Sequence, residues 1–183
     1  MPCSPLRARP VRHLPSEADP DALPGYLFPL EQGDTLYAMR SGTVIDIEIP
    51  DGVQDAGGRI RSATAPVLRV EHPDGTLACY ELFDPRTLQV KAGDPVNPST
   101  PLAIVGTYDG EHYEIVVRLY RLRTNPKRAW GDDYVTHEYF LPRLRTTEGD
   151  RIPADGALCT PLVDEALVTQ EMSRREAKAR RAK

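Results

Sequence analysis

Side chains that could bind a metal ion are sparse in this sequence. The histidines are His13, His72, His112 and His137, and the cysteines are Cys3, Cys79 and Cys159. The cysteines are odd in number and too widely spaced for a CxxC motif, which makes a reducing compartment the simpler expectation. A catalytic zinc ion needs about three protein ligands and one open coordination position. No local motif in the sequence supplies such a set.

Motifs of other enzyme classes do not occur in the chain. There is no Gly-x-Ser-x-Gly elbow, no GxxxxGK[ST] phosphate loop and no GxGxxG dinucleotide motif. Serine and threonine are plentiful, but none has a recognisable base partner. The sequence therefore disfavours nucleophilic hydrolases and nucleotide-dependent enzymes.

Length and charge bound the remaining possibilities. The chain has 183 residues and a formal net charge of −4, from 23 Lys and Arg against 27 Asp and Glu. That length predicts one domain with appendages, and the acidity, with no basic–aromatic surface in the β region, argues against nucleic-acid binding. No apolar run approaches the roughly 18–20 residues of a membrane span. No apolar segment follows the N-terminal arginines, so we expect a cytoplasmic protein, or one of the cell envelope if a leader has been removed.

Residues 25–122 have the pattern of a continuous β domain. Gly-Asp, Asp-Gly and Ser-Gly pairs separate short runs of β-branched and aromatic residues, as in strands joined by tight turns. The expected strands are 35–38, 43–49, 67–71, 76–82, 102–105 and 113–119. In the last strand Tyr113 and Ile115 alternate with Glu114 and Val116, which predicts two distinct faces.

Two segments flank this domain before the C-terminus. Residues 1–24 hold six prolines, which lack the amide donor and fix φ, so we expect an extended or disordered arm. Residues 123–160 are expected to form an irregular extension. Its aromatic side chains, such as Tyr139 and Phe140, would pack back on the sheet.

The C-terminal residues 161–183 are expected to form a basic helix. Thr160 and Pro161 suit its N-cap and first position. The last eleven residues carry six Lys or Arg and one Glu, which suits the end of a helix through the macrodipole. We expect such a charge run to be a solvated tail, and the alternative is contact with a nucleic acid, a membrane or an acidic partner.

Several segments of the β domain together carry a resemblance to a known family. In chain order they are 33–38, 41–44, 70–80, 90–96, 101–106 and 111–115. They include Val-Lys-Ala-Gly-Asp-Pro-Val at 90–96 and Glu-His-Tyr-Glu at 111–114. In order and spacing the set resembles the lysostaphin/LytM-type zinc endopeptidases, whose fold is the duplicated hybrid motif. The resemblance covers roughly residues 25–120.

The resemblance implies a zinc ion held by two histidines and one aspartate, with a further histidine pair assisting the attack of bound water. Leu23 and Leu27 stand where the family has His and Asp of a His-x-Gly-x-Asp segment. Leu82 replaces the assisting histidine of Tyr-x-His-Leu, and Gly110 replaces the first histidine of His-x-His. Only His112 survives, with the aromatic and acidic residues that follow it. One of five chemical positions is therefore retained.

These observations predict a mainly β fold, a small antiparallel barrel or sandwich of the duplicated hybrid motif type with a proline-rich N-terminal arm and a C-terminal helix. They also predict a catalytically inactive LytM-like domain, related to peptidoglycan endopeptidases, that acts as a binding or regulatory module without a metal or other cofactor. Its ligand would be a protein or a peptidoglycan peptide, bound in the former active-site groove. The groove residues expected to contact this ligand are His112, Glu114, Tyr80 and Glu81.

Two alternatives follow from the same residues. One is an active zinc-dependent peptidoglycan endopeptidase with a rearranged metal site. That site would combine His112 with nearby carboxylates, among them Glu81, Asp84, Asp109 and Glu111. The other is an interaction subunit that docks through its basic C-terminal helix.

Overall fold

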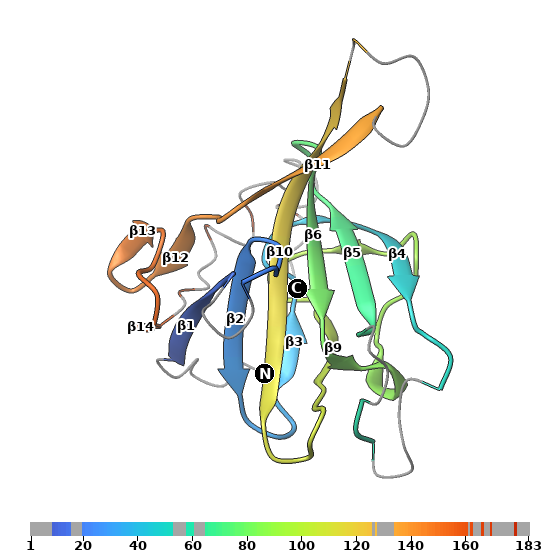
Figure 1. The fold of residues 1–183 in the computed structure, drawn as a ribbon, viewed down its shortest axis with the longest axis vertical. Helices are drawn as coiled ribbons and strands as arrows, with labels where there is room; N and C mark the ends of the chain where they lie inside the picture. The colour runs from blue at the N-terminus through green and yellow to red at the C-terminus, as the bar shows by residue number, and fades with distance from the viewer. Residues whose placement is uncertain are drawn as a thin grey trace.

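The strands build one large antiparallel sheet and two smaller ones (Figure 1). The structure is a computed structural model, and it describes residues 9–15, 20–52, 58–60, 65–125, 127, 134–160, 162, 166, 169 and 178. Within these residues the strands are β1 (Arg9–Leu14), β2 (Gly25–Leu30), β3 (Thr35–Tyr37), β4 (Gly42–Glu48), β5 (Val67–Glu71), β6 (Thr76–Glu81), β7 (Phe83–Asp84), β8 (Pro95–Val96), β9 (Pro101–Val105), β10 (Tyr113–Thr124), β11 (Val135–Phe140), β12 (Leu144–Thr146), β13 (Gly149–Arg151) and β14 (Ala157–Cys159). A short 3-10 helix, η1 (Pro85–Thr87), follows β7.

The large sheet has the strand order β14-β1-β2-β10-β6-β5-β4-β8. β10 is its longest strand, and it pairs with β2 and β6 and, in its second half, with β11. The second sheet has the order β3-β9-β7, and β12 and β13 form a separate hairpin. In the large sheet β14 lies at one end and β8 at the opposite end, with β4 next to β8, at the right in Figure 1.

The main hydrophobic core lies between the two larger sheets. The large sheet contributes Val44, Leu68, Val70, Ala78, Tyr80, Ile115, Val117 and Leu119, and the small sheet contributes Leu36, Phe83, Leu102, Ala103 and Val105. In the large sheet these side chains recur at every second position of their strands, so one face of that sheet is apolar, whereas Leu102 and Ala103 are consecutive core residues of β9. Two sheets that share a core in this way form a sandwich. The predicted mainly antiparallel β fold is confirmed.

Strand positions in the centre of the chain agree with the sequence pattern. β5 coincides with the predicted strand, and β3, β4, β6 and β9 differ from theirs by one residue at one or both ends. β10 is longer than predicted, because it continues to Thr124 instead of ending at residue 119. The added residues pair with β11, which the sequence pattern had not indicated.

Part of the predicted N-terminal arm is a strand of the large sheet. Residues 9–11 of β1 pair with β14, and residues 12–14 pair with β2. Val11 and Leu14 are both buried. Of the described residues of this arm, β1 is extended and integrated in the sheet, whereas residues 20–24 form turns and bends. Residues 1–8 and 16–19 lie outside the described residues.

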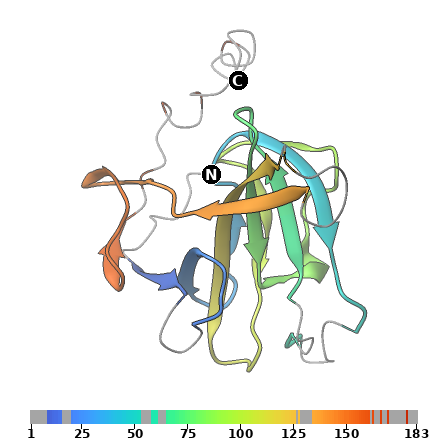
Figure 2. The ribbon, with the colours of Figure 1, turned by 45° about the horizontal axis from the view of Figure 1, so that its top comes forward.

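The β10–β11 hairpin extends beyond the rest of the sheet, and β11 pairs with the second half of β10 (Figure 2). We call the face of the large sheet opposite the main core its outer face. Tyr139 of β11 packs there against Leu77, Cys79 and Tyr120. Phe140 packs on the other side, against the main core. Both aromatic side chains therefore pack back on the sheet, as the sequence predicted.

Residues 135–159 are more regular than the sequence indicated. They form β11, the β12–β13 hairpin and β14, which returns to pair with β1. Two long-range hydrogen bonds fix this region on the sheet. The hydroxyl of Tyr26 donates to the carbonyl of Pro142 at 2.9 Å, and His13 Nε2 lies 2.9 Å from the carbonyl of Pro153. The expectation of an irregular extension therefore needs correction.

The predicted C-terminal helix over 161–183 falls almost wholly outside the described residues. Only Leu162, Ala166, Thr169 and Lys178 of that range are described. Ala166, Thr169 and Lys178 have helical backbone, but no helix is assigned over this range, so the helix and its contact with an acidic partner stay predictions. Within the described part of the chain, no helix is long and apolar enough to cross a membrane.

Candidate functional site

An apolar cluster occupies the region where the resemblance places the metal ligands. Its buried members are Leu14, Ile60, Leu82 and Val116, and Ala22, Leu27 and Ala65 pack against them. We call this set the Leu82 cluster. Leu27 stands at a replaced zinc-ligand position and Leu82 at the position of the assisting histidine, and both contribute apolar packing to this cluster. A leucine offers no donor atom to a metal ion.

Neighbouring strands bring the members of the Leu82 cluster together. Leu27 of β2 lies directly opposite Val116 of β10, and both belong to the outer face. Ile60 comes from a loop, and its amide donates to the carbonyl of Thr107 at 2.7 Å. Leu82 follows β6 and is 4% exposed. Its backbone has φ +74°, a left-handed conformation that is costly for a branched side chain.

Close backbone approach fixes the position of Leu82. The Gly106 amide donates to the Leu82 carbonyl at 2.7 Å. A Cβ atom on Gly106 would lie 2.7 Å from that same oxygen and 2.7 Å from the Cδ1 atom of Ile60. Only glycine therefore permits this loop to pack on the cluster without displacement.

Leu23, at the other replaced ligand position, is fixed to the sheet through its backbone. Its carbonyl accepts a hydrogen bond from Arg118 Nη1 at 2.6 Å, while Arg118 Nε donates to Glu81 Oε1 at 2.8 Å. The side chains of Arg118 and Glu81 are only 14% and 20% exposed. The chain passes close to Arg118 because Gly25 has no side chain, and a Cβ atom there would lie 2.9 Å from Arg118 Cγ. The predicted groove residue Glu81 is thus part of a nearly buried ion pair.

His112 lies in an exposed turn beside these residues. Its side chain is 79% exposed, and its Nδ1 atom lies 2.6 Å from Asp109 Oδ2. Asp109 Oδ1 also accepts the backbone amides of Glu111 and His112, each at 2.8 Å. These hydrogen bonds hold the pKa of Asp109 well below its usual range. Gly110, the fourth replaced position, has φ +87°, which a histidine rarely adopts.

His112 is expected to titrate above the ordinary histidine range. The hydrogen bond to Asp109 raises its pKa, and the charges of Asp109, Glu111 and Glu114 act in the same direction. Because the folded-state pKa is raised, the pair stabilises the fold below the unfolded pKa, and this contribution is lost as the pH rises through the folded pKa. An NMR titration of the His112 ring protons should show a lower pKa in Asp109→Asn. Glu111→Gln removes only a nearby charge and should lower the pKa less, and an equal pKa in wild type and Asp109→Asn would contradict the assignment.

Glu114, the next acidic residue on β10, is partly buried on the same outer face. Burial raises the pKa of its carboxyl, and the positive charges of Arg12 and His112 oppose that rise. Burial also raises the pKa of the nearby Tyr108 hydroxyl, with a further contribution from the charges of Glu81 and Glu114. The structure therefore brings Glu114, Glu81 and His112 to one region of the outer face.

Tyr80 does not belong to that region. It is buried in the main core, and its hydroxyl accepts a hydrogen bond from the Met39 amide at 2.8 Å. Tyr80 and Glu81 are consecutive residues of β6, so their side chains point to opposite faces of the sheet. The expectation that Tyr80 contacts a groove ligand therefore needs correction.

The residues of the former site do not fit a zinc ion. Asp109 bonds His112, Glu81 bonds Arg118, and Asp84 bonds Arg86. In the part of the chain that the structure describes, no three His, Cys, Asp or Glu side chains are grouped as a metal site would need. We derive no metal-dependent step for this chain.

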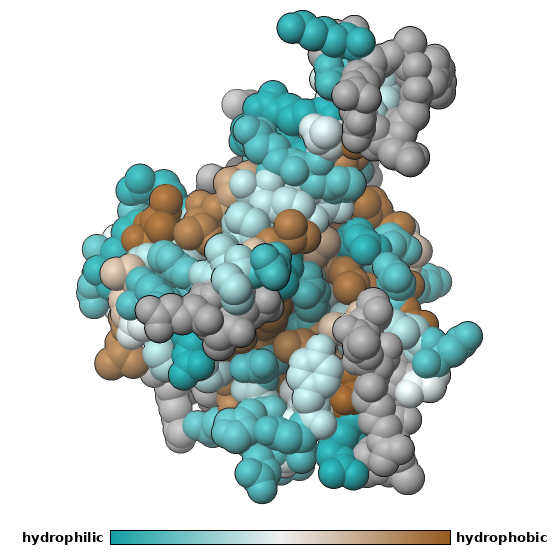
Figure 3. Space-filling view, in the orientation of Figure 1, coloured by the Kyte–Doolittle hydropathy of each residue, from teal (hydrophilic) through white to brown (hydrophobic). Residues whose placement is uncertain are grey.

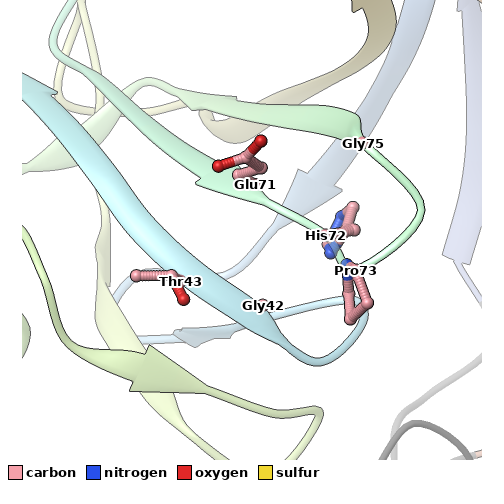
Figure 4. Close-up of a pocket in the computed structure, with 6 residues that line it drawn as sticks. All are labelled: Gly42, Thr43, Glu71, His72, Pro73 and Gly75. Atoms are coloured by element: carbon pink, nitrogen blue, oxygen red, sulfur yellow. The ribbon is translucent and has the colours of Figure 1, made fainter.

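A pocket of about 340 Å³ lies away from the Leu82 cluster, where β4 begins and β5 ends (Figure 4). Its lining residues are Gly42, Thr43, Glu71, His72, Pro73 and Gly75. His72 is buried beside it, with Nδ1 2.9 Å from the Ser41 carbonyl. This histidine orders the turn after β5, and the resemblance likewise assigns it no ligand role.

Sequence reasoning missed two features of the site. Ile60 and Leu14 complete the Leu82 cluster, but they come from a loop and from the predicted arm. The sequence indicates Asp109 only as a carboxylate of a rearranged metal site, whereas in the structure it orders the turn that carries His112. Its Asp-Gly pair is a turn signal that could have indicated this role.

Comparison with known proteins finds similar solved structures. No protein-family model and no curated protein matches the sequence. The solution structure of lysostaphin has a TM-score of 0.48 and 15% identity, over 68% of this chain and 47% of that chain. LytU has a TM-score of 0.45 and 17% identity, over 73% of this chain and 81% of that chain. The catalytic domain of lysostaphin from Staphylococcus simulans has a TM-score of 0.43 and 15% identity, over 70% of this chain and 84% of that chain. The structure is thus similar to lysostaphin-type peptidases, and the match spans about half the lysostaphin chain.

Proposed function

We propose that this chain is a non-catalytic LytM-like domain that acts by binding. The observation that carries the proposal is the Leu82 cluster, in which Leu27, at a ligand position, and Leu82, at the position of the assisting histidine, pack with Val116. Replacing polar ligands by packed leucines also removes the cost of an empty polar cavity. The protein is therefore stable without a metal ion at this place.

The ligand of the domain is a peptide, from a protein or from peptidoglycan, that contacts the outer face around His112 and Glu114. Three observations support this location. His112 is exposed and held in one orientation by Asp109. Glu114 is a partly buried carboxylate beside it. Tyr108, at 46% exposed, adds a large aromatic surface that a peptide would cover.

The metal content of the purified protein tests the non-catalytic part of the proposal. Protein isolated without chelators or a His-tag is expected to hold far less than one zinc per chain by elemental analysis. Added zinc should produce no cleavage of peptidoglycan. A ratio near one that is lost in His112→Ala, together with cleavage, would contradict the proposal and favour the rearranged metal site.

The binding part of the proposal is tested separately, by NMR. Soluble peptidoglycan stem peptides are titrated into the labelled full chain. Shifts should be confined to residues 108–114 and their neighbours, and should weaken in Glu114→Gln. Glu138→Gln, which changes a carboxylate on β11, is the control. Absence of shifts at these residues would exclude this ligand class for the site.

A further inference from the structure

A second surface with binding properties lies at the edge of the large sheet. β4 pairs with β5 along its length, but with β8 only at Gly42 and Thr43. Beyond the two residues that pair with β8, residues 46–48 have a ladder partner on the β5 side alone within the described part of the chain, and Ile45 lies at a bulge. We call residues 45–49 the β4 edge, and Figure 1 shows it on the right of the molecule. An unpaired edge presents main-chain donors and acceptors to an incoming strand.

The side chains of the β4 edge alternate between acidic and apolar. Asp46 and Glu48 lie on the outer face, where both pair with the single guanidinium of Arg69. Ile47 packs against the main core from the other face. Ile45 and Ile49 are 42% and 44% exposed. Figure 3 shows this mixture as hydrophobic and hydrophilic side chains next to one another over the right-hand part of the molecule.

The charge of this edge selects against a second copy of the chain. Pairing two identical edges would bring Asp46 and Glu48 of each copy near those of the other, and like charges across strands are destabilising. The bulge between Val44 and Asp46 and the proline at Pro50 also limit the length that can pair. A short, positively charged strand avoids the like-charge repulsion and fits within the limited length.

We propose that the β4 edge binds an extended segment of a partner protein in which lysine or arginine alternates with β-branched apolar residues. The segment adds to the sheet through main-chain hydrogen bonds, as in other cases of strand addition. Its basic side chains lie beside Asp46 and Glu48, and its apolar side chains lie beside Ile47 and Ile49. This surface is distinct from the region around His112, so the proposal does not depend on the groove function.

A fluorescent peptide of the sequence Thr-Lys-Val-Lys-Val-Lys-Thr tests the proposal with the full chain. We expect saturable binding by anisotropy that weakens with salt. The isosteric double variant Asp46→Asn/Glu48→Gln should weaken it about tenfold, the equivalent of losing two surface ion pairs. The matched control Glu148→Gln/Asp150→Asn has the same net charge change on the β12–β13 hairpin and should leave binding unchanged.

Two further probes separate strand addition from charge attraction. The same peptide with alternate N-methylated amides keeps its charge but loses main-chain donors, and we expect it not to bind. A peptide of residues 173–183 of this chain is basic but lacks the alternation, and we expect weaker binding. Equal binding of all three peptides, or no binding of the first, would overturn the proposal.

Discussion

Replacing Leu82 with alanine is expected to lower the free energy of unfolding by about 2–5 kcal/mol, the usual range for a buried leucine. Leu82 is 4% exposed and is one of the buried members of the Leu82 cluster. The loss would include the transfer energy of the side chain and the cavity left beside Ile60 and Val116. Urea denaturation measures this change, with a near-constant m-value as the check on two-state behaviour.

The backbone of Leu82 makes the glycine variant more informative than the alanine variant. Glycine in a strand is ordinarily less stable than alanine by about 0.5–1 kcal/mol. At φ +74°, however, alanine retains a left-handed penalty of about 1–2 kcal/mol that glycine avoids. We therefore expect Leu82→Gly to be at least as stable as Leu82→Ala.

Leu102 provides the matched control for this comparison. It is 1% exposed in β9, and its backbone is not among the positive-φ positions of the described residues. Leu102→Gly should be less stable than Leu102→Ala, the reverse of the order at Leu82. The same order at both positions would mean that the left-handed backbone of Leu82 carries no strain.

The parts of the fold that the sequence predicts are those with strong local patterns. β5 and the first half of β10 alternate between apolar and polar residues, and turn pairs bound them, so their positions follow from period two. β11 has no such pattern, because its residues are mostly exposed on both faces of a projecting hairpin. The strand β1 was not predicted because prolines surround it in the sequence, although Val11 and Leu14 are buried on opposite faces.

The sequence predicts which metal-site residues are replaced, but it does not predict how the replacing side chains pack. Leu27 and Leu82 are visible in the sequence as residues that cannot bind metal. Their packing on Ile60 depends on a loop contact that no local pattern encodes. Tyr80 is a different case, because period two alone would have placed it opposite Glu81 and hence in the core.

The ion pair between Arg118 and Glu81 is expected to show a second large effect. Arg118→Met would leave the Glu81 carboxylate, only 20% exposed, without its partner, and would leave the Leu23 carbonyl without its donor. Breaking such a pair from one side costs about 3–5 kcal/mol, because the remaining charge is not solvated. Arg118→Met/Glu81→Leu removes both charges, so it should lose less stability than Arg118→Met alone.

A double-mutant cycle on the free energy of unfolding isolates this coupling. The control pair is Arg123 and Glu138 on the β10–β11 hairpin, at 2.7 Å and with side chains 60% and 54% exposed. Arg123→Met should change stability by about 1 kcal/mol or less, since solvent screens an exposed pair. The contrast between the two pairs tests whether a desolvated ion pair fixes the segment before β2. Arg118 would then hold the backbone at Leu23, which stands at a ligand position. Similar losses at the two pairs would instead mean that water reaches Arg118 freely and that the segment is held by the Leu82 cluster alone.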